Sequence, residues 1–189
     1  YWRTGAPQQS YPALLEWWAQ QNAFQRHLWP GNYISRVGDS QQWPAEEILS
    51  QVELTRRHPG ASGNVLFSMK TLLGNQGGLR SALVDGPYRE QALVPASPWL
   101  SSSVPAAPRL ISRATSGDEI EVTIEPIDPE PVRWWAVQTL QGGAWQLRLV
   151  SGEYRTLHLP ATVDWVVVRA VNRSGVEGEM AYTTTWGAE

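Results

Sequence analysis

Aromatic side chains are the feature of this 189-residue sequence with the clearest chemical use, because it contains 11 Trp and 6 Tyr. Trp at this density lies well above the ordinary usage of soluble domains. A flat aromatic face can stack on a sugar ring, but most Trp side chains in folded proteins belong to a core. The composition therefore leaves two interpretations open, a carbohydrate-binding cleft and an aromatic-rich core.

Several other chemistries are excluded by residue type and spacing. His27, His58 and His158 lie in three separate predicted elements, without an HExxH motif or a carboxylate cluster, and the chain has no Cys. Metal binding therefore needs ligands that the pattern does not supply. No G-x-S-x-G nucleophile motif occurs, and the glycine-rich segment 74–78 lacks the Lys-Ser/Thr of a phosphate loop and predicts a turn. We expect neither a metal nor another cofactor.

The charge balance and hydropathy exclude two classes of partner. The chain has 15 Lys and Arg against 18 Asp and Glu, a net charge of -3, and the basic residues are scattered. Nucleic acid binding needs clustered cations to neutralise phosphates, so nucleic acid is not an expected partner. No apolar run reaches the length of about 18 residues that a membrane span requires.

The segment 26–73 predicts a strand, a loop, a helix and a second strand. His27 to Ile34 and the apolar run Asn64 to Met69 have strand character, and a helix between them begins near Pro44 and ends at His58. One face of this helix carries Ile48, Val52 and Thr55, and Glu53 can reach Arg57 one turn later. Two parallel strands joined by a crossover helix form a βαβ unit, which must be part of a larger α/β sheet or barrel.

The residues before this unit predict the end of a strand at 1–4 and a helix at 12–22. Ser10 is a suitable N-cap for this helix, whose expected buried face carries Leu14, Leu15 and Trp18. After the βαβ unit, residues 92–100 contain two prolines and predict an extended strap across the α/β part. We therefore assign residues 1–102 to a first, α/β domain.

Residues 103–189 predict an all-β domain. Small residues and prolines at 101–108 indicate a linker, and Glu119 to Glu125 then alternates strictly between polar and apolar residues. Further strands are expected at 133–140, 144–150, 153–159, 163–172 and 179–185. Short strands at this spacing are typical of an antiparallel β-sandwich.

Seven short motifs follow one another through the first domain: YW at 1–2, YPALLEWW at 11–18, HLWPGNY at 27–33, WPAEEI at 43–48, QVELTR at 51–56, GNVLFSMK at 63–70 and ALVP at 92–95. Together they resemble the final third of the glycosyl-hydrolase-like family 10 proteins, which are bacterial (β/α)8 barrels, usually secreted or lipoproteins. The resemblance implies that residues 1–2 end the sixth barrel strand, and that 27–34 and 64–69 are the seventh and eighth. The second domain resembles a fibronectin type III domain, on the AVNRSG segment at 170–175.

Such barrels place their sites on the loops that follow the strands, here residues 3–9, 35–42 and 70–77. Glycoside hydrolysis ordinarily needs two carboxyl groups, and these loops contain a single one, Asp39. We expect Asp39 to be a loop residue, and the family's catalytic acids to lie on strands one to five. The chain alone is therefore expected to be inactive.

The resemblance implies that five residues at or near the strand ends form part of the wall of a substrate-binding cleft. Trp2, Trp29 and Tyr33 can stack on a sugar, Asn32 offers a donor and an acceptor, and Lys70 can bind an acidic or N-acetyl substituent. The alternative for each aromatic residue is a role in plugging the barrel. We therefore predict these five as substrate-binding residues.

The expected function is that of the carboxyl-terminal fragment of a glycoside hydrolase of the bacterial envelope, either secreted, periplasmic or lipid-anchored. Its partner would be a cell-wall, peptidoglycan-like or other polysaccharide glycan. The alternatives are a non-catalytic module that binds carbohydrate or protein, and a structural spacer. Two βα units and a strand end cannot close a barrel. We therefore expect residues 64–69 to be buried, with some of the cover from outside residues 1–102: the missing half of the barrel or another chain, a second copy of this chain, or the sandwich.

Overall fold

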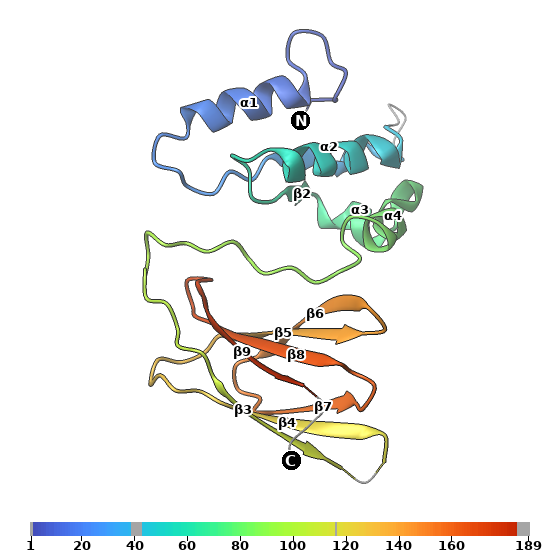
Figure 1. Ribbon diagram of the computed structural model, residues 1–189. Coiled ribbons are helices and arrows are strands. Elements are labelled where there is room, and N and C mark those ends of the chain that lie inside the picture. Colours follow the sequence, from blue (N-terminus) through green and yellow to red (C-terminus); the bar gives the residue numbers. More distant parts are fainter. Residues whose placement is uncertain (1, 39–42, 116, 185–189) are drawn as a thin grey trace. The chain divides into compact units, whose positions relative to one another are not determined.

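The computed structural model describes residues 2–38, 43–115 and 117–184, which form two compact units (Figure 1). The first unit ends at Glu90 and the second begins at Gln91. This division lies before the expected boundary at residue 102, because the extended strap belongs to the second unit. There Gln91 accepts a hydrogen bond from the Leu149 amide at 2.7 Å, and the Ser97 amide donates to the Ser174 carbonyl at 2.7 Å.

The first unit contains a βαβ unit, as the sequence predicts. Strand β1 (Gly31–Tyr33) pairs in parallel with β2 (Val65–Phe67), and helix α2 (Ala45–Arg57) connects them. The remaining helices are α1 (Tyr11–Gln21), α3 (Met69–Leu73) and α4 (Leu79–Asp85), with 3-10 turns η1 (Ile34–Arg36) and η2 (Gln76–Gly78). Both strands are shorter than expected, since each has one strand partner among the described residues to define its length.

Helix α2 follows its sequence signals closely. Its first turn carries two Glu and its last turn two Arg, which suits the helix dipole. Pro44, expected at the first helical position, is the N-cap, so the helix begins one residue later than predicted. Ile48, Val52 and Thr55 are buried, and Arg57 donates to Glu53 at 2.8 Å. The helix predicted from periodicity and caps is therefore confirmed.

Helix α1 begins where predicted but buries less than predicted. Ser10 caps it by accepting a hydrogen bond from the Ala13 amide at 3.4 Å, and Tyr11 and Leu15 are buried. Trp18, expected on the buried face, is exposed.

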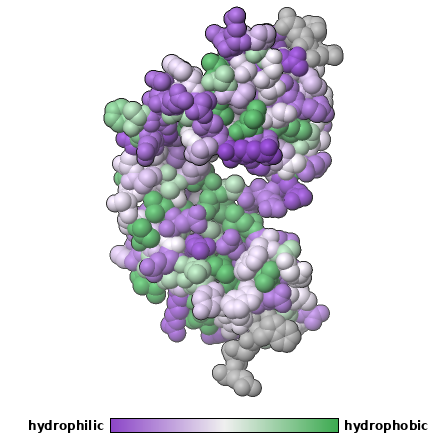
Figure 2. All heavy atoms as spheres, turned by 45° about the horizontal axis from the view of Figure 1, so that its top comes forward, coloured by the Kyte–Doolittle hydropathy of each residue, from purple (hydrophilic) through white to green (hydrophobic). Residues whose placement is uncertain are grey.

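Strand β2 has one covered and one open face. Leu66 packs against the core of the first unit, which α2 and α4 line with Ile48, Val52, Leu79 and Leu83. Its neighbours Val65 and Phe67 point the opposite way and are 49% and 51% exposed. The expected burial of residues 64–69 is therefore wrong for this chain by itself, because helices cover one side of the two strands. Figure 2 shows hydrophobic residues reaching the surface among hydrophilic ones.

The second unit is an antiparallel sandwich of seven strands in the described residues. They are β3 (Arg109–Ala114), β4 (Glu119–Glu125), β5 (Trp134–Gln141), β6 (Ala144–Ser151), β7 (Thr156–Pro160), β8 (Trp165–Val171) and β9 (Glu177–Thr184). One sheet has the order β3-β4-β7 and the other β6-β5-β8-β9. Both sheets contribute to one core, in which Val122, Trp135 and Val166 are fully buried. The predicted sandwich is confirmed, and β4 has the predicted bounds.

No helix in the described residues is long and apolar enough to cross a bilayer.

Candidate functional site

The carboxyl ends of β1 and β2 bring aromatic, basic and hydroxyl side chains together. The ring centroids of Tyr33 and Phe67 lie 6.0 Å apart, and the Arg36 guanidinium lies 5.2 Å from the centroid of the Tyr33 ring. Ser35 donates from its hydroxyl to the Phe67 carbonyl at 3.3 Å. Parallel strands place their carboxyl ends at one edge of a sheet, and ligand sites of α/β proteins are usually found at that edge.

A cavity of about 620 Å³ lies beside this edge. The loop after Trp2, the turn after β1 and the first turn of α2 form its wall, with the lining residues Trp2, Arg3, Thr4, Gly5, Ala6, Pro7, Arg36, Trp43 and Glu47. Two Trp and two Arg residues thus line one space. Such a lining can stack on a flat ring and donate hydrogen bonds to hydroxyl, carbonyl or carboxylate oxygens.

Glu47 is the carboxylate among the described residues that line this cavity, and its oxygens are already engaged. It accepts hydrogen bonds from the amide and hydroxyl of Thr4, at 2.6 and 3.0 Å, and from Gln51 Nε2 at 2.9 Å. Arg3 Nε lies 3.7 Å from it, and the residue is 8% exposed. Glu47 therefore holds the loop at Arg3 and Thr4 in place.

Asn32 lies inside the unit and not on a cavity wall. Its side chain is 0% exposed, donates to Gln51 Oε1 at 2.9 Å and to the Tyr11 hydroxyl at 3.3 Å, and accepts from Asn64 Nδ2 at 2.9 Å. The Tyr11 and Thr55 hydroxyls, 2.7 Å apart, complete the group. Burial raises the pKa of Tyr11, and its hydrogen bonds oppose this only in part.

The Gln51 side chain connects this buried network to residues that line the cavity. Gln51 donates to the Trp2 carbonyl at 3.2 Å as well as to Glu47. The inner face of α2 thus carries Glu47, Gln51 and Thr55 at a spacing of four residues, all buried. The sequence analysis does not predict this role for Glu47, although the spacing of four residues between Glu47, Gln51 and Thr55 is a signal that could have indicated it.

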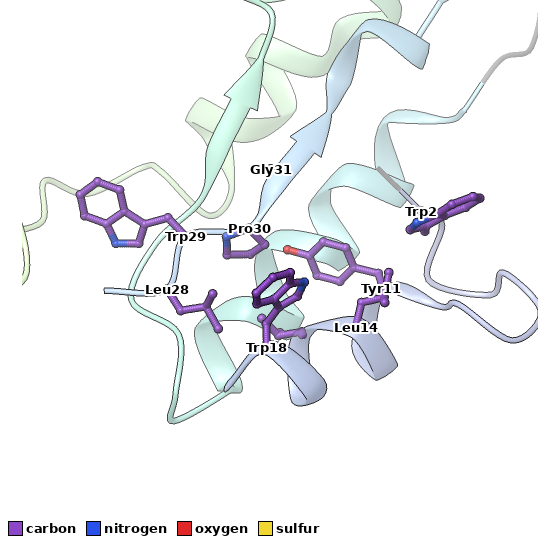
Figure 3. Close-up of a pocket in the computed structure, with 9 residues that line it drawn as sticks. Trp2, Tyr11, Leu14, Trp18, Leu28, Trp29, Pro30 and Gly31 are labelled. Carbon is purple, nitrogen blue, oxygen red and sulfur yellow. The ribbon is translucent and has the colours of Figure 1, made fainter. Parts of the chain in front are cut away.

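A second, apolar cavity of about 270 Å³ lies between α1 and the amino end of β1 (Figure 3). Its lining residues are Trp2, Tyr11, Leu14, Leu15, Trp18, Leu28, Trp29, Pro30 and Gly31. Trp29 belongs here, at the opposite end of β1 from Tyr33. Its indole donates to Ser62 Oγ at 2.9 Å, and its ring stacks on His27 at 5.5 Å.

The five predicted wall residues therefore do not gather in one place. Trp2 lines both cavities, Trp29 lines the apolar one, and Tyr33 lies at the carboxyl edge beside Arg36. Asn32 is buried, and Lys70 is exposed on α3 and lines neither cavity. Their contact with substrate stays a prediction.

Two further points concern chemistry. Within the described ranges, no group of three or more His, Cys, Asp or Glu could hold a metal ion. Asp39, the carboxylate expected in the loop after β1, lies outside the described residues.

The fold and the site define an α/β unit with a cavity at its strand ends, followed by an antiparallel β-sandwich. No family model matches the chain. It is similar to Glycosyl hydrolase YngK of Bacillus subtilis (strain 168), with 28% identity over 132 residues that cover 67% of this chain and 26% of that protein. The alignment thus spans about a quarter of the relative's length.

Solved structures with some likeness include an fn3 domain of the human collagen alpha-1(XX) chain, with a TM-score of 0.38 and 22% identity over 44% of this chain and 86% of that one. The glycoside hydrolase domain of Endo-D from Streptococcus pneumoniae R6 has a TM-score of 0.32 and 24% identity, and the match covers 43% of this chain and 15% of that one.

Proposed function

We propose that this chain is the carboxyl-terminal part of a glycoside hydrolase that acts on bacterial cell-wall or other polysaccharide glycan. The similarity to a glycosyl hydrolase carries the proposal. The cavity at the strand ends supports it, because Trp2 and Trp43 offer ring faces while Arg3 and Arg36 offer donors. These are the groups that a sugar's C–H faces and hydroxyls require.

In this proposal the first unit supplies one wall of the substrate cleft. Glu47 and Thr4 fix the loop that carries Arg3, and the Tyr33 ring supports the Arg36 guanidinium. A wall held in this way binds substrate without reorganising, which lowers the entropic cost of binding. Since Glu47 is engaged by its donors, the two catalytic carboxyl groups would come from other parts of the protein.

We further propose that β1 and β2 are the seventh and eighth strands of a (β/α)8 barrel. Their parallel pairing and the exposed side chains of Val65 and Phe67 support this, because parallel sheets are normally covered on both faces. The missing barrel half, or a second copy of the chain, would cover this face. The site of action would be the bacterial envelope.

The test compares variants of the full-length protein by the reducing ends released from purified peptidoglycan and from chitin. Removing a stacking ring usually costs at least about 1.4 kcal/mol, so Trp43→Ala should lower activity about tenfold or more. Phe24→Ala, a variant of an exposed aromatic residue that lines neither cavity, should leave the activity unchanged. A full-length protein that hydrolyses neither substrate would contradict the proposal.

A further inference from the structure

The two outer faces of the sandwich differ in chemistry. In β4, Ile120, Val122 and Ile124 enter the core, so the alternating Glu residues point outward. The register places Arg109 opposite Glu125 and Arg113 opposite Glu121 on this face. A charged outer face is what an antiparallel sheet in contact with water normally shows.

The outer face of the β6-β5-β8-β9 sheet is mostly apolar instead. In β5 and β8, Trp135, Val137, Val166 and Val168 enter the core, so their neighbours point outward. The strand register places these outward-pointing residues and their partners on β6 and β9 on one surface, here called the aromatic face. It contains Leu140, Trp145, Leu147, Trp165, Val167, Met180 and Tyr182, with Gln138 and Arg169 among them. Contiguous apolar surface of this kind usually marks an interaction site.

Two Trp side chains of this face lie in one row across the strands. Leu140 lies opposite Trp145 on one side and opposite Trp165 on the other, so the two Trp are two strand spacings, about 10 Å, apart. Tyr182, which pairs with Val167, lies beside this row, and its ring centroid is 5.7 Å from that of Trp165. All three side chains are exposed. Alternate rings of an extended glycan can stack at such a separation.

The polar groups of the face favour a glycan over a protein partner. Arg169 donates to Gln138 Oε1 at 3.2 Å and contacts the Met180 sulfur at 3.6 Å, so both partners are neutral and the guanidinium lies along the sheet. Since neither of these two partners is charged, a protein partner would have to supply a carboxylate of its own to bury the guanidinium at low cost. Sugar hydroxyls can hydrogen-bond to the guanidinium while water still reaches it.

We propose that the aromatic face is a second glycan-binding site, at which alternate sugar rings of a polysaccharide chain stack on Trp145 and Trp165 beside Tyr182. The choice of a glycan as ligand rests on the proposed function. The site itself would anchor the protein to insoluble polysaccharide and take no part in hydrolysis.

The experiment measures retention of the 189-residue chain on crystalline chitin, cellulose and purified peptidoglycan. We expect retention on at least one of them, and Trp145→Ala and Tyr182→Ala should each raise the dissociation constant about tenfold. Tyr154→Ala is the matched control, because Tyr154 is 64% exposed against 62% for Tyr182 and lies in a turn outside the face. Tyr154 contacts the core residue Trp135 through its backbone carbonyl, which accepts a hydrogen bond from Trp135 Nε1 at 2.9 Å.

Three results would overturn the inference: no retention on any of the three, equal retention of Trp145→Ala and the parent chain, or self-association that Tyr182→Ala abolishes. Thermal unfolding of each variant shows that a loss of retention is not a loss of folding. Parallel assays of Trp43→Ala separate the two proposals. Retention that depends on Trp145 in a full-length protein without hydrolytic activity would leave this inference standing and end the other.

Discussion

Asn32 and its partners link three elements of the first unit through side-chain hydrogen bonds. Asn32 lies on β1, Gln51 and Thr55 on α2, and Tyr11 on α1. Buried polar groups are stable only when all of them are paired, and no buried side-chain nitrogen or oxygen among the described residues lacks a partner. The network therefore specifies one arrangement of these elements, in addition to stabilising it.

Replacing Asn32 with Ala should lower the free energy of unfolding by about 2 to 4 kcal/mol. Gln51 Oε1 and Asn64 Nδ2 lose a partner, and each unpaired buried group costs about 1–3 kcal/mol. Urea denaturation measures the change. Lys70→Ala, at an exposed position, is the control and should stay within about 0.5 kcal/mol. An Asn32→Ala chain as stable as the parent would contradict the buried network.

Tyr11 makes the stability depend on pH in the alkaline range. Burial raises its pKa above the ordinary value of 10.0, so the unfolded chain loses this proton first. The stability that protonated Tyr11 contributes to the folded state is therefore fully present below about pH 10. It is lost as the pH rises through the raised folded-state pKa.

Denaturation at several pH values from 7 to 11 tests this dependence. The Tyr11→Phe variant should be less stable at neutral pH, by about 1–2 kcal/mol for the lost hydrogen bonds, and should lose less stability at alkaline pH. Burial also raises the pKa of Tyr88, so part of the decline should remain. An alkaline decline that is the same in both chains would show that Tyr11 is not its source.

At the scale of elements, β2 shows how differently neighbouring residues contribute. Leu66→Ala removes a side chain from the core and should cost about 1–3 kcal/mol, whereas Val65→Thr changes a half-exposed residue and should cost less than about 0.5 kcal/mol. Both changes lie in one short strand, so the comparison isolates the face. Chemical denaturation of the two variants checks it, and equal costs would mean that the face of Val65 is also covered.

Local signals explain which elements the sequence predicts. Helix α2 was predictable because its caps, its charges and its apolar period all lie within the segment. The ends of β1 and β2 were not, because a strand's length depends on neighbours distant in sequence. The exposure of Trp18 has the same origin, since its helical period indicates a buried face but cannot supply the element that would cover it.

The candidate site was predictable only in part. The sequence indicates where strand ends bring side chains together, which accounts for Trp2 and Tyr33. It does not indicate that Asn32 points toward the helices or that Glu47 folds back onto Thr4, because both depend on long-range pairing.

At the scale of the whole molecule, each unit has its own core. Ile48 lies in that of the first unit and Ile124 in that of the sandwich, both fully buried. Changing either to Ala should cost about 2–5 kcal/mol within its own unit. Hydrogen exchange, resolved by peptide, should show faster exchange in α2 for Ile48→Ala and in β4 for Ile124→Ala. Equal acceleration in both units from either variant would contradict separate cores.

The hydrogen bonds along the rim of the four-stranded sheet have a consequence for recombinant production. The Leu149 amide on edge strand β6 donates a hydrogen bond to Gln91, and the Glu179 amide on edge strand β9 donates one to the Pro105 carbonyl. Both edges of this sheet are therefore partly blocked against pairing with further strands. Strands β1 and β2 have no such cover in the described residues, and unpaired rims of this kind promote aggregation. Low soluble yield of the chain would thus originate in the first unit, and a version beginning at Gln91 would retain both blocking segments while losing both unprotected strands.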